Sequence, residues 1–168
     1  MADTDIFKYS TNERLGKMDV DVITLTPDTA TEECLAGDVI FQADELPNMV
    51  SVDAGTCMVH SIGVLDDDDN GQAIDIVFMD TTGLLDAGDD GGSIDAADGA
   101  IPDAIIGVVQ ITSYFDGIAW QYGYKTNIGL VLKAPASSKS IYVAAVNRGT
   151  TATWTAAGLR LQIGVIKD

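Results

Sequence analysis

The sequence predicts an all-β protein, an antiparallel β-sandwich of about eight strands. Two observations carry this prediction. Apolar residues alternate with polar ones in short runs, which is the period of a strand that buries one face. Glycine, proline, asparagine, aspartate or serine separates these runs, as expected for antiparallel strands joined directly rather than through helices. A chain of 168 residues that is 46% hydrophobic can bury a core, so we expect one domain over residues 18–168.

The strands are expected at intervals along this domain. The clearest is 159–165, where Leu159, Leu161, Ile163 and Val165 alternate with Arg160, Gln162 and Gly164. The runs 58–65 and 74–78 flank an acidic segment, 66–71, which predicts a hairpin with a long turn. The other candidates are 19–25, 38–43, 105–112, 118–122, 127–134 and 140–146. An open sandwich leaves strand edges uncovered, and a ring or trimer would cover them.

Two segments do not fit the strand pattern. Residues 83–103 are rich in Gly, Asp and Ala, which predicts a surface loop with one short helix. Ser93 and Asp95 are candidate N-caps of that helix, and Pro102 is a break. Residues 1–17 have no clean period, so they are expected to form either a frayed N-terminal segment or an arm that docks on a neighbouring subunit.

Charge is strongly segregated along the chain. Of the 26 acidic residues, 22 lie between Lys17 and Lys125, a stretch without lysine or arginine. The two ends hold all 9 cations, so the formal charge is −22 in the middle and +5 at the ends. A middle of one sign repels nucleic acid and anionic membranes. No apolar stretch reaches the roughly 18 residues that cross a bilayer, and no signal sequence is recognised, so we expect a soluble, unprocessed chain.

Nothing in the sequence favours catalysis. Cys34 and Cys57 have no metal-ligand spacing and are expected as small buried thiols, with a disulfide as the alternative. The single histidine, His60, lies in the run 58–65, where a strand residue satisfied by its neighbours is expected rather than a base or a ligand. There is no phosphate-binding loop and no nucleophile elbow. We therefore expect no enzymatic activity and no cofactor.

The acidic segment suggests a cation site that is only half complete. Asp66, Asp68, Asn70 and Gly71 match the first half of a calcium loop, where alternate oxygens surround the ion. Val77 stands where the register requires a bidentate glutamate. A solvated turn is therefore the preferred interpretation, and Asp66, Asp68 and Asn70 are weak metal candidates.

Aromatic residues gather in one short stretch, at Tyr114, Phe115, Trp120, Tyr122 and Tyr124. The last three are spaced by two, so they form a stripe if they share one strand. Core or subunit interface is the preferred interpretation of such a stripe. A carbohydrate platform would require exposed rings beside polar side chains. Trp120, Tyr122 and Tyr124 are therefore candidate interface residues.

The run 140–146 is apolar on both faces. Ile141, Val143 and Ala145 lie on one face, and Tyr142, Ala144 and Val146 on the other. A strand of this kind is buried twice, inside the sandwich and against something else. We expect a contact between subunits there, which makes Tyr142 an interface candidate.

Several segments resemble the small head proteins of tailed double-stranded DNA phages, the capsid decoration or cement proteins. They are the runs 127–134, 140–146 and 158–161, the turn 148–150, the strand–turn–strand 64–78 and the segment 95–109. The resemblance covers residues 20–166. The chain departs from the family in its long acidic run, 66–69, and in the Gly-rich stretch near Asp89.

The resemblance implies a jelly-roll or related β-sandwich that trimerises and sits on the outside of a phage capsid, where it bridges neighbouring major capsid proteins. The implied partners are the major capsid protein and further copies of the chain, without nucleic acid or membrane. The implied location is the capsid surface of the virion, after synthesis in the host cytoplasm. The charge pattern adds that Lys8, Arg14 and Lys17 lie toward the shell while the acidic loops face solvent.

Two other functions stay open. One is a calcium- or carbohydrate-binding β-sandwich module that would use the Asp66 turn and the Trp120 stripe. The other is a DNA-mimic inhibitor, whose carboxylates imitate phosphates in a basic cleft. That role requires the acids to lie on one regular face, whereas many of them fall in loops.

Overall fold

The structure is a computed structural model that describes residues 19–81, 91–94 and 100–168. The described elements are strands β1 (Asp19–Leu25), β2 (Glu33–Cys34), β3 (Val39–Leu46), β4 (Thr56–Asp66), β5 (Ile74–Met79), β6 (Ile105–Ile111), β7 (Tyr114–Asp116), β8 (Gln121–Lys133), β9 (Ile141–Asn147), β10 (Ala152–Thr153) and β11 (Leu159–Lys167), with the short helix α2 (Ala100–Ala104) before β6. The predicted all-β class is confirmed. Within these ranges no helix is long and apolar enough to cross a membrane.

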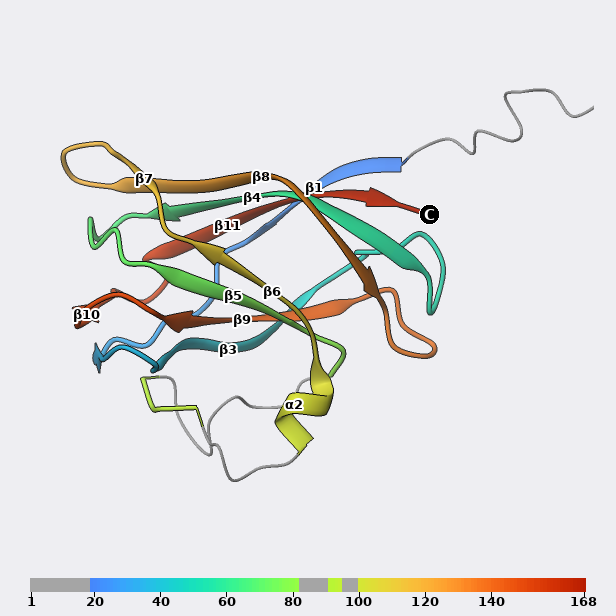
Figure 1. The fold of residues 1–168 in the computed structure, drawn as a ribbon, viewed down its shortest axis with the longest axis horizontal. Helices are drawn as coiled ribbons and strands as arrows, with labels where there is room; N and C mark the ends of the chain where they lie inside the picture. The colour runs from blue at the N-terminus through green and yellow to red at the C-terminus, as the bar shows by residue number, and fades with distance from the viewer. Residues whose placement is uncertain (1–18, 82–90, 95–99) are drawn as a thin grey trace, which may run out of the picture.

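Two antiparallel sheets pack face to face (Figure 1). One has the strand order β1-β11-β4-β8-β7 and the other β3-β9-β5-β6, while β10 and β2 form a small pair of their own. Apart from β5 and β6, which are neighbours in one sheet, successive long strands alternate between the two sheets. This is the order of an eight-stranded jelly roll, to which β7 is added at one edge. The jelly-roll architecture that the resemblance implied is therefore present.

The core lies between the two sheets and follows the predicted alternation. The members of β11 that point inward are Leu159, Leu161, Ile163 and Val165, all buried. Phe41 on β3, Phe78 on β5 and Trp154 before β11 are the largest side chains that are fully buried. Burial of each large apolar side chain contributes about 1.5–3 kcal/mol, so this layer supplies most of the stability of the fold.

A second apolar layer covers the outer face of the β3-β9-β5-β6 sheet. Ala144 and Val146 of β9 are fully buried there, packed with Val77, Ile94 and Ala104. The segment 91–94 runs beside β3, because the amide of Val39 donates to the carbonyl of Gly92 and the amide of Gly91 donates back to Val39. The second burial expected for β9 is thus provided by the chain itself, through the connection between β5 and β6.

Two sequence predictions about the strands are wrong. β4 and β5 do not form a hairpin, because β4 pairs with β11 and β8 while β5 pairs with β9 and β6. The acidic segment therefore crosses from one sheet to the other. The runs 118–122 and 127–134 are not two strands either: Gln121–Lys133 is one strand, and residues 117–120 form the turn before it. Alternation indicates which residues of a strand are buried, but it does not indicate which strand is its hydrogen-bonded neighbour in the sheet.

Candidate interaction surface

The outer face of the β1-β11-β4-β8 sheet carries no acidic side chain on its described strands. The residues that alternate with the core positions are Val20, Val22 and Thr24 on β1; Arg160, Gln162, Gly164 and Ile166 on β11; Thr56, Met58, His60, Ser61, Gly63 and Leu65 on β4; and Tyr122, Tyr124, Thr126, Val131 and Lys133 on β8. The only charges in this set are the two cations, Arg160 and Lys133. We call this set the acid-free face.

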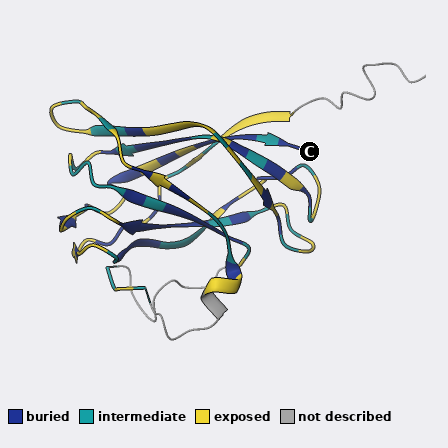
Figure 2. Ribbon diagram, in the orientation of Figure 1, coloured by how far each residue is buried: buried dark blue, intermediate teal, exposed yellow. Residues whose placement is uncertain are grey.

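Large apolar side chains of the acid-free face are exposed to solvent. The exposed fraction is 65% for Val20, 61% for Val22, 60% for Tyr124 and 64% for Val131. Figure 2 shows β1, the edge strand of the sheet, as exposed along most of its length. Exposed apolar side chains on a sheet face whose strands carry no carboxylate, in a chain with a net charge of −17, are typical of a surface that meets a partner.

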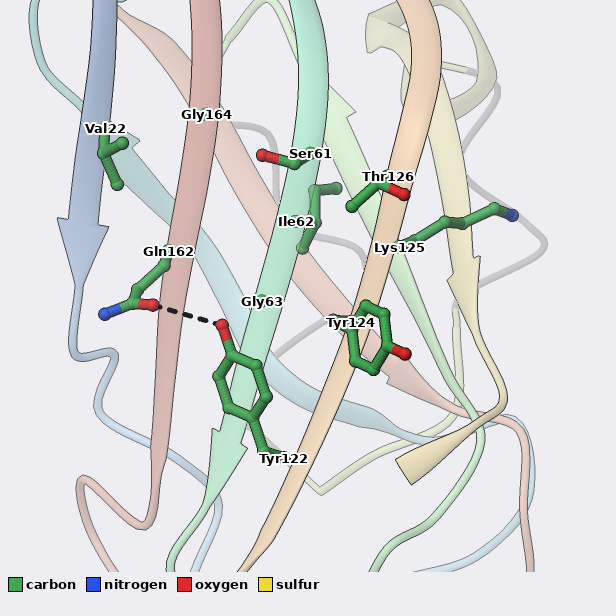
Figure 3. A pocket seen from close by; sticks show the side chains of 10 residues that line it. All are labelled: Val22, Ser61, Ile62, Gly63, Tyr122, Tyr124, Lys125, Thr126, Gln162 and Gly164. Atoms are coloured by element: carbon green, nitrogen blue, oxygen red, sulfur yellow. Dashed lines mark hydrogen bonds between the residues drawn. The ribbon is translucent and has the colours of Figure 1, made fainter. Parts of the chain in front are cut away.

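A shallow hollow of about 300 Å³ lies on this face, between Val22 of β1 and the tyrosines of β8 (Figure 3). Gly63 and Gly164 form its floor. A β-carbon on Gly63 would collide with the Tyr122 hydroxyl, so the tyrosine ring lies over the strand only because residue 63 has no side chain. The Tyr122 hydroxyl donates a hydrogen bond of 3.2 Å to Oε1 of Gln162. A second hollow, of about 240 Å³, continues past His60 and Ile166.

An aromatic row extends the acid-free face to one end of the sheet. Phe115 of β7 is the cross-strand partner of Tyr122. Its ring centroid is 5.9 Å from that of Trp120, and the rings of Tyr122 and Tyr124 stack with centroids 6.4 Å apart. Phe115 and Trp120 are exposed by 62% and 38%. The predicted stripe is therefore not core, which leaves an interface or a ligand platform.

The row ends at a strained turn between β7 and β8. Ile118 has a φ of 77° and is 95% exposed, the highest value among the large apolar side chains in the described ranges. A β-branched residue in the left-handed region is a genuine outlier and costs about 1–3 kcal/mol. The turn is held by Oδ1 of Asp116, which accepts from the Ile118 amide at 3.1 Å, and by a bond of 2.9 Å from the Gly117 amide to the Trp120 carbonyl.

The acidic segment acts as a structural turn. Asp66 is fully buried, and its carboxylate accepts hydrogen bonds from the amides of Asp68 and Gly71. Burial raises the pKa of Asp66, and these hydrogen bonds oppose the increase. Asp68 accepts from Thr155, and the amide group of Asn70 donates to the Thr153 carbonyl. Within the described residues no group of three or more His, Cys, Asp or Glu side chains is arranged to hold a metal ion.

The other candidates from the sequence lie apart from the acid-free face. Tyr142 is half-buried at the margin of the layer on the opposite sheet. Lys8, Arg14 and Lys17 lie outside the described residues, in the segment that leads into β1 at the edge of the acid-free face. Cys34 and Cys57 are both buried, as expected, and they form no disulfide with each other in the structure. His60 lies on β4 but is exposed.

Sequence reasoning missed the valines of the acid-free face and the turn at Ile118. The run 19–25 alternates aspartate with valine, and the usual assumption places the valines inward. In the structure Ile23 and Leu25 pack against the core, so Val20 and Val22 point out. For Ile118 the sequence did contain a signal. The preceding Asp116-Gly117 pair is typical of a turn, which places Ile118 in the turn rather than in the strand.

Comparisons with known proteins do not assign a role to the acid-free face. No family model matches the chain, and no curated protein matches it. Among solved structures, it is similar to a chain described as the capsid of Ralstonia phage GP4, with 17% identity over 91% of this chain and 86% of that chain, at a TM-score of 0.41. It is also similar to a chain of Desmodium yellow mottle tymovirus, with 10% identity over 90% and 81% of the two chains, at a TM-score of 0.28. At these TM-scores neither likeness supports an inference about function.

Proposed function

We propose that this chain is a non-enzymatic virion structural protein that binds the outer surface of a phage capsid and stabilises it by bridging major capsid proteins. The observation that carries the proposal is the acid-free face. In a chain with 26 acids and 9 cations, the described strands of this face carry no outward carboxylate and expose valine and tyrosine, while Asp67 and Asp168 reach the face only at its ends, beside Arg160 and Thr56. Depletion of charge with enrichment of aromatic residues is typical of the centre of a protein–protein interface.

The difference between the two outer faces of the sandwich suggests how the chain is oriented on the capsid shell. The connection between β5 and β6 starts at Asp80 and ends in α2, and it holds seven of the acidic residues within 80–103. Its described parts pack on the outer face of the β3-β9-β5-β6 sheet, opposite the acid-free face. In the proposed complex the acid-free face lies on the shell, the acid-rich connection faces solvent, and the cations of residues 1–17 reach the shell from the β1 edge.

Bridging follows from repetition of this contact. We propose that three copies associate, which covers the edge strands β1 and β6 that one subunit leaves open. A trimer that docks at three equivalent sites gains effective concentration, so each contact can be weak. Light scattering on the purified chain measures this directly, and a monomer at working concentration would contradict the trimer.

The test of attachment uses heads from a phage strain in which the gene for this chain is deleted. Purified chain is expected to sediment with these heads and to raise the temperature at which they open. Val22→Asp places a carboxylate on the acid-free face and should abolish binding. Val52→Asp is the matched control: Val52 precedes β4, lies outside the acid-free face and the edge strands, and is exposed by 58%. Equal binding by the two variants would contradict the proposed surface.

Charge reversal tests the N-terminal segment separately. Lys8→Glu, Arg14→Glu and Lys17→Glu together should abolish attachment at physiological salt, because the segment proposed to reach the shell would then carry the opposite charge. If this triple variant occupies the heads as fully as the wild type does, the proposed role of the three cations is wrong. The proposed role of the acid-free face is not affected by that result.

A carbohydrate-binding module is the second candidate, and one observation favours it. The rings of Tyr122 and Tyr124 stack at the surface beside Gln162, Ser61 and Thr126, and no acid lines the larger hollow. Stacked rings next to uncharged donors and acceptors suit a neutral sugar. A glycan screen followed by calorimetry tests this, with Tyr124→Ala as the variant that should lose binding. Saturable binding of a glycan by a chain that ignores deletion heads would favour this function over capsid attachment.

A further inference from the structure

The turn between β7 and β8 has the properties of a preformed anchor. Its apex, Ile118, is exposed by 95% and has a φ of 77°. A polar residue that tolerates a positive φ, such as asparagine, would remove both the exposed apolar surface and the strain at this position. The fold therefore gains nothing from isoleucine here. Strain that the fold does not need is a mark of a site kept for another purpose.

The turn is also held by hydrogen bonds and ring contacts, and a turn that is already ordered loses less entropy on binding. Asp116 accepts from the amide of Ile118, and Gly117 donates to the carbonyl of Trp120. The Trp120 ring lies over Gly117, where an added β-carbon would collide with it, and it contacts the ring of Phe115. These contacts hold the backbone around Ile118 in one conformation, so this backbone does not have to be ordered when Ile118 binds a partner.

We propose that Ile118 inserts into an apolar pocket with a basic rim on the protein shell that this chain decorates. This inference rests on the proposed function and names the contact that anchors it. The turn continues the acid-free face, since Phe115 pairs with Tyr122 across the strands. The turn is convex and small, so it requires a concave partner site and acts as one anchor within a larger interface.

Charge decides between a protein pocket and a lipid bilayer. The net charge of −17 opposes approach to an anionic membrane. Asp116 is exposed at the base of the turn, and insertion into lipid would strip water from its carboxylate without a counter-ion. A protein pocket rimmed by lysine or arginine accepts both the apolar apex and this carboxylate.

The test compares affinity for the deletion heads with thermal stability. Ile118→Asn removes the apolar apex and introduces a residue that tolerates a positive φ. We expect this variant to bind the heads at least about tenfold more weakly and to unfold about 2–4 °C higher than the wild type. Ile118→Val keeps both features and should resemble the wild type. Val52→Asn removes an exposed valine from the connection before β4, which enters the sheet at the end opposite this turn, and should leave affinity unchanged.

Each other outcome has a defined meaning. If the wild type binds the heads and Ile118→Asn binds equally well, this inference is wrong while the proposed function stands. If Ile118→Asn unfolds at a lower temperature, Ile118 serves the fold and the inference is also wrong. If the wild type does not bind the heads, the proposed function fails and the anchor fails with it. Binding to phosphatidylserine vesicles that Ile118→Asn abolishes would assign the turn to a membrane instead.

The basic rim is tested by Asp116→Asn, which keeps an oxygen to accept from the Ile118 amide. Affinity for the heads should fall at low salt and approach that of the wild type at high salt, because only the screened charge term is lost. An affinity that does not change at any salt concentration would exclude the basic rim and leave an uncharged pocket.

Discussion

The carboxylate of Asp68 accepts hydrogen bonds from both the backbone amide and the hydroxyl of Thr155, at 2.8 and 2.9 Å. Asp68 belongs to the connection from β4 to β5, and Thr155 precedes β11. One side chain thus ties two connections at the same end of the sandwich. The acidic segment, which suggested half of a calcium loop, uses its carboxylates to hold the chain together.

Asp68→Asn should lower the free energy of unfolding by about 1–2 kcal/mol, because asparagine has one acceptor oxygen where the carboxylate has two, and its hydrogen bonds with Thr155 are no longer charge-assisted. Asp69→Asn is the matched control: it changes the charge equally, and asparagine tolerates the φ of 60° at this position. Urea unfolding measures both variants. Equal losses would show that net charge, rather than the Thr155 contact, is responsible.

The buried carboxyl of Asp66 gives a pH dependence with a definite sign. Its pKa is raised above 3.8, first by burial, so the folded state holds the proton more tightly than the unfolded state does. This contribution to stability is complete below 3.8 and is lost as the pH rises through the folded pKa. The difference in unfolding free energy between the wild type and Asp66→Asn should therefore decline from acid to neutral pH. A difference that grows with pH would contradict this cause.

A buried lysine depends on one surface aspartate. The side chain of Lys167 is 6% exposed, and its ammonium lies 2.8 Å from the carboxylate of Asp21. Asp21→Asn leaves that ammonium buried without a counter-ion, whereas Lys167→Met replaces it with an apolar chain. We expect Asp21→Asn to lower the urea midpoint more than Lys167→Met does, and Asp19→Asn to lower it least. The reverse order would mean that the pair itself stabilises the fold.

The same pair adds a second pH term of opposite sign. The hydrogen bond from Lys167 lowers the pKa of Asp21 below 3.8. This stabilisation is present above 3.8 and is lost as the pH falls through the folded value. Acid unfolding of the wild type should thus have a component that Asp21→Asn lacks, measurable as a smaller stability loss of the variant between mildly and strongly acidic buffer.

The thiols should be unreactive in the folded protein. Burial raises the pKa of Cys57 to about 11, and Cys34 is fully buried. Because the thiolate is the nucleophile, iodoacetamide at neutral pH should add no mass to the native chain and two adducts after unfolding in urea. Rapid alkylation of the native chain would indicate local opening near β2 or β4.

Local patterns were sufficient for most strands. The runs 19–25, 58–65, 105–112, 140–146 and 159–165 coincide closely with β1, β4, β6, β9 and β11. Pairing was harder to foresee: the predicted hairpin of β4 and β5 satisfied every local rule and still does not exist. A strand partner depends on contacts between residues far apart in the chain, which no short window contains.

The candidate surface was predictable only in part. The stripe of Trp120, Tyr122 and Tyr124 was foreseen as a group, and the structure brings it together with Phe115. The sequence could not place this stripe at the surface, since an aromatic run looks the same in a core and on an exposed face. Tyr142 is the opposite case, because the chain itself covers most of the strand face on which it lies.

By itself, the amino-acid sequence determined the all-β class, the alternation that builds the core and the segregation of charge, because each is a property of neighbouring residues. Only the tertiary structure decided that the carboxylates leave one sheet face free, that Val20 and Val22 point outward on it, and that Ile118 stands at its end in a strained turn. The physical reason is that exposure is set by what packs on each face, and those contacts join distant segments of the chain.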